Sequence, residues 1–445
     1  MSVRFSTKLI IWQFTCLFFL GFSVSNQVQA QQVLSLQEAI QIALKNNYDI
    51  QLIQNEVEIV KNNVNPGNAG MLPNLTGDFS TGGSRQNTVQ TQSTGTQRVT
   101  DGARSTNLRY GVGLNWTIFD GFTMFATFDK LKALEQQGEV NAKSIIVSTV
   151  SNVIMAYYDI VRQNQLVISA DSSIDVSTMR LHLANQKLEL GKGSKLDVLA
   201  AQVDYNTDTT NYLQQKNLLR QYKIRLNQLL VRALDTDFEV INQLTIDANL
   251  KLGKLVNQAT ALNPNLQAAF IQKKISELTL KEIKGNRYPR IGVNGGYEHS
   301  QSTSPTGFNT EFKADGLTYG ITASLPIFNG FLQRQNERNA RIAIESSELN
   351  YEKTKLDLIS QLSTVYQNYF TYLSLLQLEA KNLEIAKQSL NITVEKYRLG
   401  SIPPLELREA QRNAINAETR YIETQFQAKL AETTLKELSG SLNME

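Results

Sequence analysis

The sequence predicts a mixed, mainly α-helical chain that contains two copies of one unit, each with a pair of β-strands and a long helical hairpin. A turn occurs twice, because Leu190 to Val198 recurs as Leu399 to Leu407, 209 residues further on. Long apolar patterns with a seven-residue period flank both turns. Segments of alternating apolar and small polar residues precede both patterns and predict four strands in all.

The first thirty residues have the pattern of an export signal. Arg4 and Lys8 precede an apolar run from Leu9 to Phe22, and Val28-Gln29-Ala30 forms a small-residue cleavage site. The run is too short to span a bilayer. Cys16, the only cysteine, lies within it. We therefore predict a signal peptide at residues 1–30 and a mature chain without disulfides or a catalytic thiol.

Charge and composition exclude several classes of function. The formal charge of +3 falls to about +1 without the two basic residues of the signal, so nucleic acid is not an expected partner. The mature chain has no continuous apolar run of about eighteen residues, the length of a transmembrane helix. The two histidines, His182 and His299, are far apart in sequence. No metal-ligand spacing, phosphate loop or Ser-His-Asp pattern occurs, so no catalysis, metal or cofactor is expected.

Two internal matches define the duplication. Asn47–Gln51 matches Asn263–Gln267 at an offset of 216 residues, and Ile118–Phe122 matches Ile327–Phe331 at 209. The offset changes by seven between these matches, so we expect an exposed segment of different length there. The predicted division is a first repeat at 31–235, a connector at 236–252 and a second repeat at 253–445.

Each repeat is expected to begin with short helices. Ser35, followed three residues later by Glu38, forms a capping box before apolar residues at helical spacing. A second helix is predicted from about Asp49 until Pro66-Gly67 stops it.

The strands follow. Apolar side chains occupy alternate positions from Leu108 to Ile118 and again from Leu317 to Ile327, which is typical of a barrel strand between lipid and water. Weaker strands precede these, so β-hairpins are predicted at about 75–118 and 291–328. The polar stretches at 84–105 and 300–316 are predicted to be mobile loops. A soluble β-sandwich is the alternative, but four good strands are few for so long a chain.

The long helices carry a strict seven-residue period. In the first repeat it comprises Ile146, Val153, Ile160, Val167, Ile174, Leu181 and Leu188, and in the second Leu362, Tyr369, Leu376, Leu383, Leu390 and Tyr397. After the turns it continues through Val198, Tyr205, Tyr212, Leu219 and Leu226, and through Leu407, Ala414, Tyr421, Ala428 and Leu435. This period predicts left-handed supercoiling. A helix from Phe122 to Leu190 would be about 100 Å long, a length suited to crossing a space.

Four strands cannot close a transmembrane barrel by themselves. An open sheet edge in lipid leaves backbone groups unpaired, and bacterial barrels have about eight strands or more. The chain is therefore expected to share a barrel with further copies. Two copies would supply eight strands and three copies twelve.

The sequence resembles TolC-type outer-membrane efflux proteins over about residues 34–440. The resemblance is carried by Leu36-Gln37-Glu38-Ala39, by Ala43 to Asn47, by the Phe-(Asp/Asn)-Gly entries to both long helices and by the two Leu-Gly turns. It implies a homotrimer in the outer membrane, with a twelve-stranded transmembrane β-barrel continued by an α-helical barrel through the periplasm. The expected function is the passive exit duct of a tripartite efflux pump or type I secretion system. The implied partners are outer-membrane lipid, a periplasmic adaptor and an inner-membrane transporter.

The resemblance also implies a gate where the helical hairpins end. Asp197 and Tyr397 match the family's gate aspartate and tyrosine, and Glu406 and Glu409 match two acids that ring the pore mouth. Ile402 stands where the family's prototype has an arginine, so a gate held by packing and a Tyr397–Asp197 hydrogen bond is expected in place of a salt bridge. The residues expected to contact the adaptor are Leu190, Gly191, Lys192, Gly193 and Ser194 at the first tip, and Leu399, Gly400, Ser401, Ile402 and Pro403 at the second.

Plainer interpretations of the same residues remain open. The three acids also suit the first turn of a helix, where the dipole favours negative charge, and Tyr397 lies on the apolar heptad face. For the whole chain, the alternative is a non-transporting trimeric coiled-coil surface protein, such as an adhesin or envelope spacer. A strand pair in each repeat favours the duct, because a stalk adhesin usually carries its strands at one end.

Overall fold

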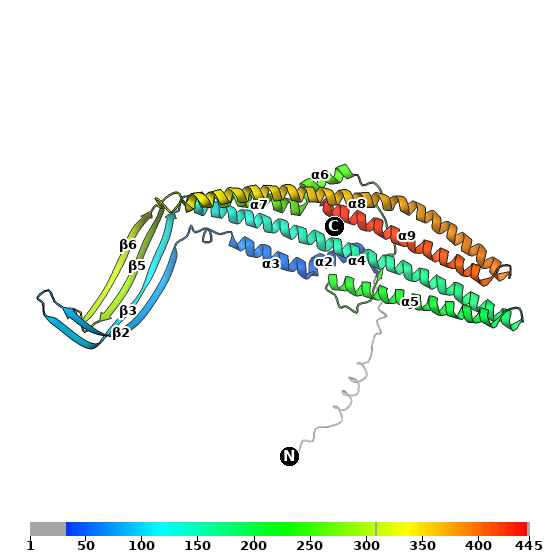
Figure 1. Ribbon diagram of the computed structural model, residues 1–445, viewed down its shortest axis with the longest axis horizontal. Coiled ribbons are helices and arrows are strands. Elements are labelled where there is room, and N and C mark those ends of the chain that lie inside the picture. The colour runs from blue at the N-terminus through cyan, green and yellow to red at the C-terminus, as the bar shows by residue number, and fades with distance from the viewer. Residues whose placement is uncertain (1–32, 308, 443–445) are drawn as a thin grey trace, which may run out of the picture.

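The structure is a computed structural model that describes residues 33–307 and 309–442, so the predicted signal peptide lies outside the described residues. The chain is elongated, with a curved sheet at one end and long helices running away from it (Figure 1). The helices are α2 (Leu36–Asn46), α3 (Tyr48–Asn63), α4 (Thr123–Glu189), α5 (Lys195–Leu229), α6 (Leu252–Leu262), α7 (Pro264–Gly285), α8 (Leu332–Arg398) and α9 (Pro404–Leu438). The strands are β1 (Val33–Leu34), β2 (Asn74–Thr91), β3 (Gln97–Phe119), β4 (Glu239–Val240), β5 (Arg290–Thr303) and β6 (Glu311–Ser324).

The two helical hairpins have equal lengths. α4 and α8 contain 67 residues each, and α5 and α9 contain 35 each. At 1.5 Å per residue, the longer helices extend for about 100 Å. Every residue of the predicted seven-residue pattern is buried or half-buried, with Val153, Leu362 and Leu226 wholly enclosed. The predicted heptad seam is therefore confirmed.

The main apolar core lies where the short helices meet the long ones. One cluster joins α2, the middle of α4 and the end of α5, and a second joins α6, α8 and the end of α9. Asn47 caps α3 with its side-chain oxygen, while its amide donates to Leu229 O at 2.9 Å. Asn263 caps α7 and donates to Leu438 O at 3.0 Å in the same way. The duplication thus extends to the contacts that fix the short helices to the hairpins.

The start of the first repeat follows the sequence prediction. Ser35 Oγ accepts from the Glu38 backbone N–H at 3.2 Å, and Glu38 Oε2 accepts from the Ser35 backbone N–H at 2.9 Å, so the capping box is confirmed. The short strand β1 pairs in parallel with β4 of the connector. Further along, the connector contacts α9, because Lys429 Nζ donates to Thr245 O at 2.8 Å.

The larger sheet is antiparallel, with the order β2-β3-β5-β6. The central β3–β5 pair joins the two repeats, with Tyr110 opposite His299. Apolar side chains on one face, such as Tyr319 and Ile321, are exposed to 85% and 76%. β2 and β6 form the two edges, and neither has a further strand beside it in the described chain.

The prediction of mobile loops at 84–105 and 300–316 is wrong for most of those residues. β2 continues to Thr91 and β3 begins at Gln97, while β5 continues to Thr303 and β6 begins at Glu311. These strand ends are mostly polar, and isolated apolar residues such as Val89, Val99 and Phe312 form no regular alternation. Their backbone ladders form without an apolar face that is buried along its length, because antiparallel pairing satisfies the N–H and C=O groups.

The entries to α4 and α8 require two successive residues with positive φ. Gly121 and Phe122 have φ of 73° and 69°, and Gly330 and Phe331 have 68° and 66°. A Cβ at position 121 would lie 2.1 Å from Gly285 O, so only glycine allows the turn to pack against the end of α7. The shared Phe-(Asp/Asn)-Gly motif therefore encodes the change from strand to helix.

One window of α4 is apolar enough to cross a membrane by length and composition. Within the chain, 61% of that window is buried, and α4 contributes residues such as Val150, Tyr157 and Val161 to the main core. Packing of the helices accounts for its apolar character.

Candidate functional site: the helical tips

Each helical hairpin ends in a glycine-containing turn at the end of the molecule farthest from the sheet (Figure 1). Gly191 has φ of 70°, its N–H donates to Leu188 O at 3.0 Å, and the Lys192 N–H donates to Lys187 O at 2.7 Å. This pair of bonds is a Schellman motif, which satisfies the last carbonyls of α4. At Gly193 a Cβ would lie 3.0 Å from the Lys187 Cβ, so the turn is held tightly against the helix end.

The second tip has the same cap and a different start to the next helix. Gly400 has φ of 76°, its N–H donates to Tyr397 O, and the Ser401 N–H donates to Lys396 O, both at 3.0 Å. Pro403 is the N-cap of α9 and Pro404 its first residue, where the missing N–H costs nothing.

Leucines project at matching positions on both tips. Leu190 and Leu196 are 71% and 74% exposed on the first tip, and Leu399 and Leu405 are 83% and 74% exposed on the second. The pairs are related by the 209-residue offset. Each tip therefore presents two apolar side chains on a rigid turn.

Asp197 caps a helix in this structure. Its Oδ2 accepts from Ser194 N at 3.2 Å and from Ser194 Oγ at 3.0 Å, while the Asp197 N–H donates to Ser194 Oγ at 3.1 Å. This reciprocal capping box fixes the first turn of α5. These hydrogen bonds are the geometry expected of Asp197 as an acid in the first turn of a helix.

Tyr397 is 2% exposed and lies on the apolar seam, with Lys187 Nζ 4.4 Å from its ring centroid. Burial raises the pKa of the phenol, the charge of Arg180 opposes that rise, and the charge of Asp197 adds to it. Among the described residues, the side-chain hydrogen bonds of Asp197 go to Ser194 and none goes to Tyr397. The two residues are close enough to interact electrostatically, and the expected hydrogen bond between them stays a prediction for the assembled protein.

Glu406 and Glu409 are both exposed at the start of α9. Glu406 lies in the first helical turn, where the dipole favours an acid. Ile402, in the turn itself, is half-buried.

A buried polar network near the tips joins the two hairpins. On the first hairpin, Arg180 Nη1 of α4 lies 2.5 Å from Asp204 Oδ2 of α5. Arg408 of α9 then reaches both acids of α5, with Nε 3.4 Å from Asp204 Oδ1 and Nη1 3.0 Å from Asp208 Oδ2. Gln411 Nε2 donates to Asp208 Oδ2 at 3.1 Å. One helix of the second hairpin is therefore held to the first hairpin by charge-assisted hydrogen bonds.

The network continues into α4. Gln411 Nε2 also donates to Ser173 O at 3.0 Å and to Ser173 Oγ at 2.9 Å. The side chains of Arg180, Asp208 and Gln411 are almost fully enclosed. Buried ion pairs of this kind contribute more to a defined arrangement than to net stability.

None of these residues was expected from the sequence to form a site. Asp204 and Asp208 are four residues apart, so they lie on one face of a helix, and Arg408 follows immediately after the heptad residue Leu407. Acids next to the apolar seam of one predicted helix, and an arginine next to the seam of another, could have indicated an ion pair between the two helices. Their pairing across 200 residues of sequence became visible only in the structure.

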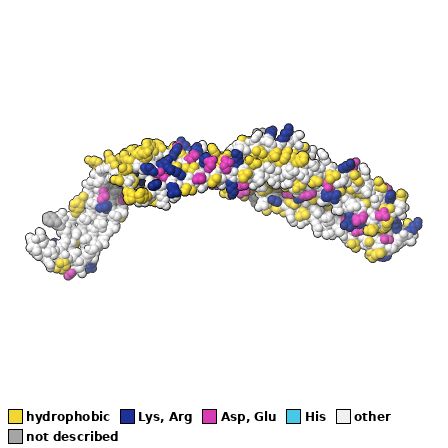
Figure 2. Space-filling view, turned by 45° about the horizontal axis from the view of Figure 1, so that its top comes forward, with side chains coloured by type: hydrophobic (Ala, Val, Ile, Leu, Met, Phe, Trp, Pro, Cys, Tyr) yellow, Lys and Arg dark blue, Asp and Glu magenta, His cyan; other side chains and the backbone are white. Residues whose placement is uncertain are grey.

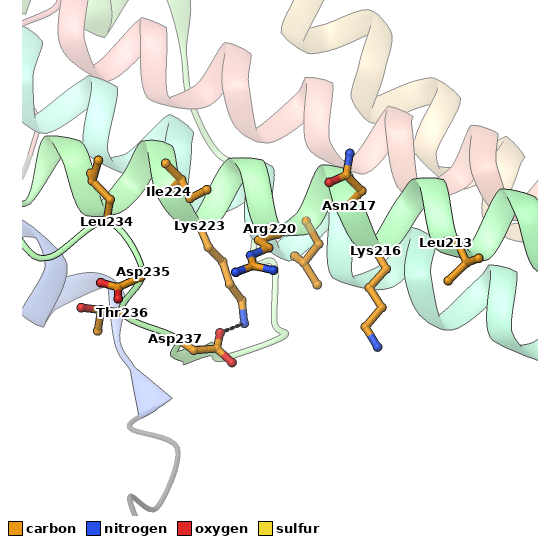
Figure 3. Close-up of a pocket in the computed structure, with 11 residues that line it drawn as sticks. Leu213, Lys216, Asn217, Arg220, Lys223, Ile224, Leu234, Asp235, Thr236 and Asp237 are labelled. Atoms are coloured by element: carbon orange, nitrogen blue, oxygen red, sulfur yellow. Dashed lines mark hydrogen bonds and ion pairs between the residues drawn. The ribbon is translucent and has the colours of Figure 1, made fainter.

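The described residues outline no catalytic centre. His182 is exposed on α4, and His299 lies on β5 beside Asp315. Within residues 33–307 and 309–442, no three His, Cys, Asp or Glu side chains are placed to hold a metal ion. One groove lies between α5 and the chain after it, where Lys223 Nζ pairs with Asp237 Oδ1 at 2.6 Å (Figure 3). The groove is open to solvent on the side of the helices. Its lining mixes apolar and charged side chains and indicates no particular reaction.

A sheet with a lipid-type face, continued by helices about 100 Å long that end in capped turns, defines a class of envelope-spanning channel proteins. The chain belongs to the outer membrane efflux protein family, whose model matches residues 39–231 and 255–441. It is accordingly an outer-membrane protein that extends into the periplasm.

Individual relatives and a solved structure agree with membership of this family. The chain is 22% identical over 417 residues to the antibiotic efflux pump outer membrane protein ArpC of Pseudomonas putida, covering 91% of this chain and 83% of the relative. It is 19% identical over 420 residues to the proteases secretion protein PrtF of Dickeya chrysanthemi, covering 93% and 89%. The crystal structure of the Campylobacter jejuni CmeC outer membrane channel has the same fold, with a TM-score of 0.74, 17% identity, and coverage of 91% and 85%.

Proposed function

We propose that three copies of this chain form a passive exit duct, with a twelve-stranded barrel in the outer membrane and a helical barrel in the periplasm. The observation that carries the proposal is the four-stranded sheet with two open edges, β2 and β6. A sheet in lipid needs partners for these edges, because unpaired N–H and C=O groups there are costly. Three such sheets make a ring of twelve strands.

The duplication indicates how the copies join. Inside the chain, β3 of the first repeat pairs with β5 of the second. The equivalent pairing for the outer strands is β6 of one copy with β2 of the next. The same step repeated around an axis closes a ring of identical chains.

An unpartnered seam on α8 supports the same assembly. Leu378, Ile385, Ile392 and Leu399 recur every seven residues and are 54%, 56%, 58% and 83% exposed. They lie two positions after the heptad residues that pack within the chain, so they occupy another face of α8. A helix with two apolar seams suits a position between two neighbours in a barrel.

The proposed partners follow from the exposed tips. A periplasmic adaptor docks against the turns at residues 190–194 and 399–403, where the projecting leucines supply apolar contacts, and it connects the duct to an inner-membrane transporter. Relatives of this chain include components of drug efflux pumps and of protease secretion systems. The same duct serves either kind of system, since selection of the cargo belongs to the inner-membrane component.

The gate of the duct is proposed to lie at these tips. Asp197 and Tyr397 hold the closed state together with the network of Arg180, Asp204 and Arg408. In three copies, Glu406 and Glu409 place six carboxylates around the entrance and attract cations. Opening requires the second hairpin to separate from the first, which the Arg408 contacts oppose.

Planar-bilayer conductance tests the proposal, with light scattering on the same detergent-extracted protein. A duct gives three chains per particle and conducting events. A trimeric adhesin or envelope spacer gives the same mass without conductance. A soluble monomer would contradict both interpretations.

A further inference from the structure

The junction between the sheet and the helices carries a cluster of arginines beside a band of exposed apolar side chains (Figure 2). Arg334, Arg338 and Arg341 are exposed on the first turns of α8. With Arg287, Phe331, Gln335 and Glu337 they line a groove of about 660 Å³. The junction adjoins the membrane-spanning strands, so this groove lies at the periplasmic surface of the membrane.

The charges of the groove do not balance. Glu337 is 3% exposed, and its carboxylate accepts from Arg287 Nη2 at 2.8 Å and from Gln333 Nε2 at 2.9 Å. This acid therefore neutralises Arg287. Arg334, Arg338 and Arg341 remain as three positive charges on one stripe of the helix.

The position of the arginines runs against the preference of the helix. α8 begins at Leu332 and has no acid in its first turn, although the dipole favours acids there and disfavours cations. Arg334 is the third residue of this helix. A bound anion would compensate both the cluster and the helix terminus.

Apolar contacts border the cluster on the membrane side. Ile327, Phe328 and Phe331 are exposed to 93%, 73% and 68%, and the rings of Phe328 and Phe331 are in edge-to-face contact. Aromatic residues followed by cations are the arrangement that suits acyl chains next to phosphate groups.

The duplication shows which side chains stay accessible in the proposed ring. The first-repeat counterparts of Phe331, Arg334, Arg338 and Arg341 are Phe122, Phe125, Asp129 and Lys132, at an offset of 209. All four are exposed, although α4 packs against both α3 and α7. The same face of α8 therefore remains open when a neighbouring copy covers its other side.

The counterpart residues also show that the cluster is special to the second repeat. Its basic side chains correspond to one aromatic, one acidic and one basic residue in the first repeat. A cluster needed only for folding of the unit would be expected in both copies. The excess of positive charge is confined to this part of the second repeat, since the whole chain is almost neutral.

We propose that Arg334, Arg338 and Arg341 bind the phosphate headgroup of an anionic phospholipid in the periplasmic leaflet of the outer membrane, while Phe328 and Phe331 contact its acyl chains. Guanidinium groups bind phosphate oxygens in a bidentate manner, which favours arginine over lysine at such a site. The accessibility of the groove in the assembly rests on the proposed ring of three chains.

Native mass spectrometry of the full-length mature protein in mild detergent tests the proposal. Phosphatidylglycerol and phosphatidylcholine with identical acyl chains are the probes. The wild-type protein is expected to bind phosphatidylglycerol at least about tenfold more tightly than phosphatidylcholine, since cations near an anionic lipid attract its headgroup. The R334Q/R338Q/R341Q variant is expected to lose that preference.

A matched control removes three lysines further along the same helix, in the K353Q/K355Q/K381Q variant. This control is expected to keep the preference for phosphatidylglycerol. Equal binding of both lipids by the wild-type protein, or an unchanged preference in the arginine variant, would overturn the proposal. Displacement of the lipid by equimolar inorganic phosphate would also overturn it, because the groove would then be an anion site without selectivity for lipid.

Two further measurements keep the outcome separate from folding and from assembly. If the triple variant fails to fold, R338Q alone is expected to weaken phosphatidylglycerol binding several-fold, and no change in this variant would contradict the site. Light scattering reports the number of chains independently. A particle without three chains would refute the proposed duct. A wild-type trimer with no preference for phosphatidylglycerol would refute only the arginine site.

Discussion

Arg408 Nη1 donates hydrogen bonds to both carboxylate oxygens of Asp208, at 3.2 and 3.0 Å, and so connects helices that are 200 residues apart in the chain. The bond joins α9 of the second hairpin to α5 of the first. It lies one to two turns from the start of α9, close to the proposed entrance of the duct.

Replacement of Arg408 by Gln is therefore expected to loosen the tips. The change removes the charge-assisted bonds to Asp208 and leaves that carboxylate with Gln411, at a cost of about 1.5 to 3 kcal/mol. In planar bilayers the variant should conduct more often than the wild-type protein. Arg412→Gln, a change at a cation one helical turn further along, provides the control. Equal open times for Arg408→Gln and the wild-type protein would exclude the link as a latch.

Asp197 offers a test that separates capping from gating. Asp197→Ala and Ser194→Ala each destroy the same capping box, and each is expected to destabilise the first turn of α5 by about 0.5 to 2 kcal/mol. Only the first removes the negative charge near Tyr397. If Asp197 acts at the gate, its variant raises conductance more than the serine variant does. Equal conductance of the two would assign Asp197 to the helix cap alone, and Tyr397→Phe in the same assay tests the phenol.

The acids at the entrance should control ion selectivity. Glu406→Gln with Glu409→Gln removes six negative charges from a trimeric ring and is expected to shift the reversal potential in a salt gradient toward weaker cation preference. The exposed position of both residues makes a loss of folding unexpected. An unchanged reversal potential would place these carboxylates away from the ion path.

The proposed joint between copies has a definite register. Applying the offsets of 209 and 216 residues to the β3–β5 pairing places Ile321 of one chain opposite Thr81 of the next. Cysteines at these two positions are expected to form a disulfide between chains, because opposed residues in antiparallel strands lie about 4.5 to 5.5 Å apart. The pair of Thr81→Cys with Leu317→Cys is displaced by four residues and should not form it. Non-reducing electrophoresis distinguishes the two, and equal cross-linking would refute the register.

The caps that end α5 and α9 have different residues at the equivalent position with positive φ. Val231 has φ of 52°, whereas its counterpart Gly440 has 67° in the same type of cap. A β-branched side chain is strained at positive φ, so Val231→Gly is expected to stabilise the protein by up to about 1 kcal/mol. Gly440→Val should do the reverse, since a Cβ there would lie 3.0 Å from Leu262. Thermal unfolding followed by circular dichroism measures both, and a lower melting temperature for Val231→Gly would contradict the strain.

The architecture could be predicted from local patterns because its main elements are repetitive. The seven-residue period fixed the seam of the long helices, and residues such as Leu362 and Leu226 are completely buried as that period requires. The strands were predicted too short at their polar ends, because the ends of β2 and β5 are ordered by backbone pairing and carry no regular side-chain alternation. The last strand was predicted too long, because β6 ends at Ser324, before the predicted strand residue Ile327. Sequence periodicity reports burial, and these segments are not buried.

The sequence by itself determined the duplication, the hairpin tips and the alternation of the strands, since each depends on residues close together in the chain. Only the tertiary structure decided which distant charges meet, such as Arg408 with Asp208 and Arg287 with Glu337. Only the structure also shows that Arg334, Arg338 and Arg341 form no ion pair within the described residues, because the buried Glu337 pairs with Arg287. A side chain's electrostatic partner depends on how helices cross in space, and spacing along one chain does not specify that crossing.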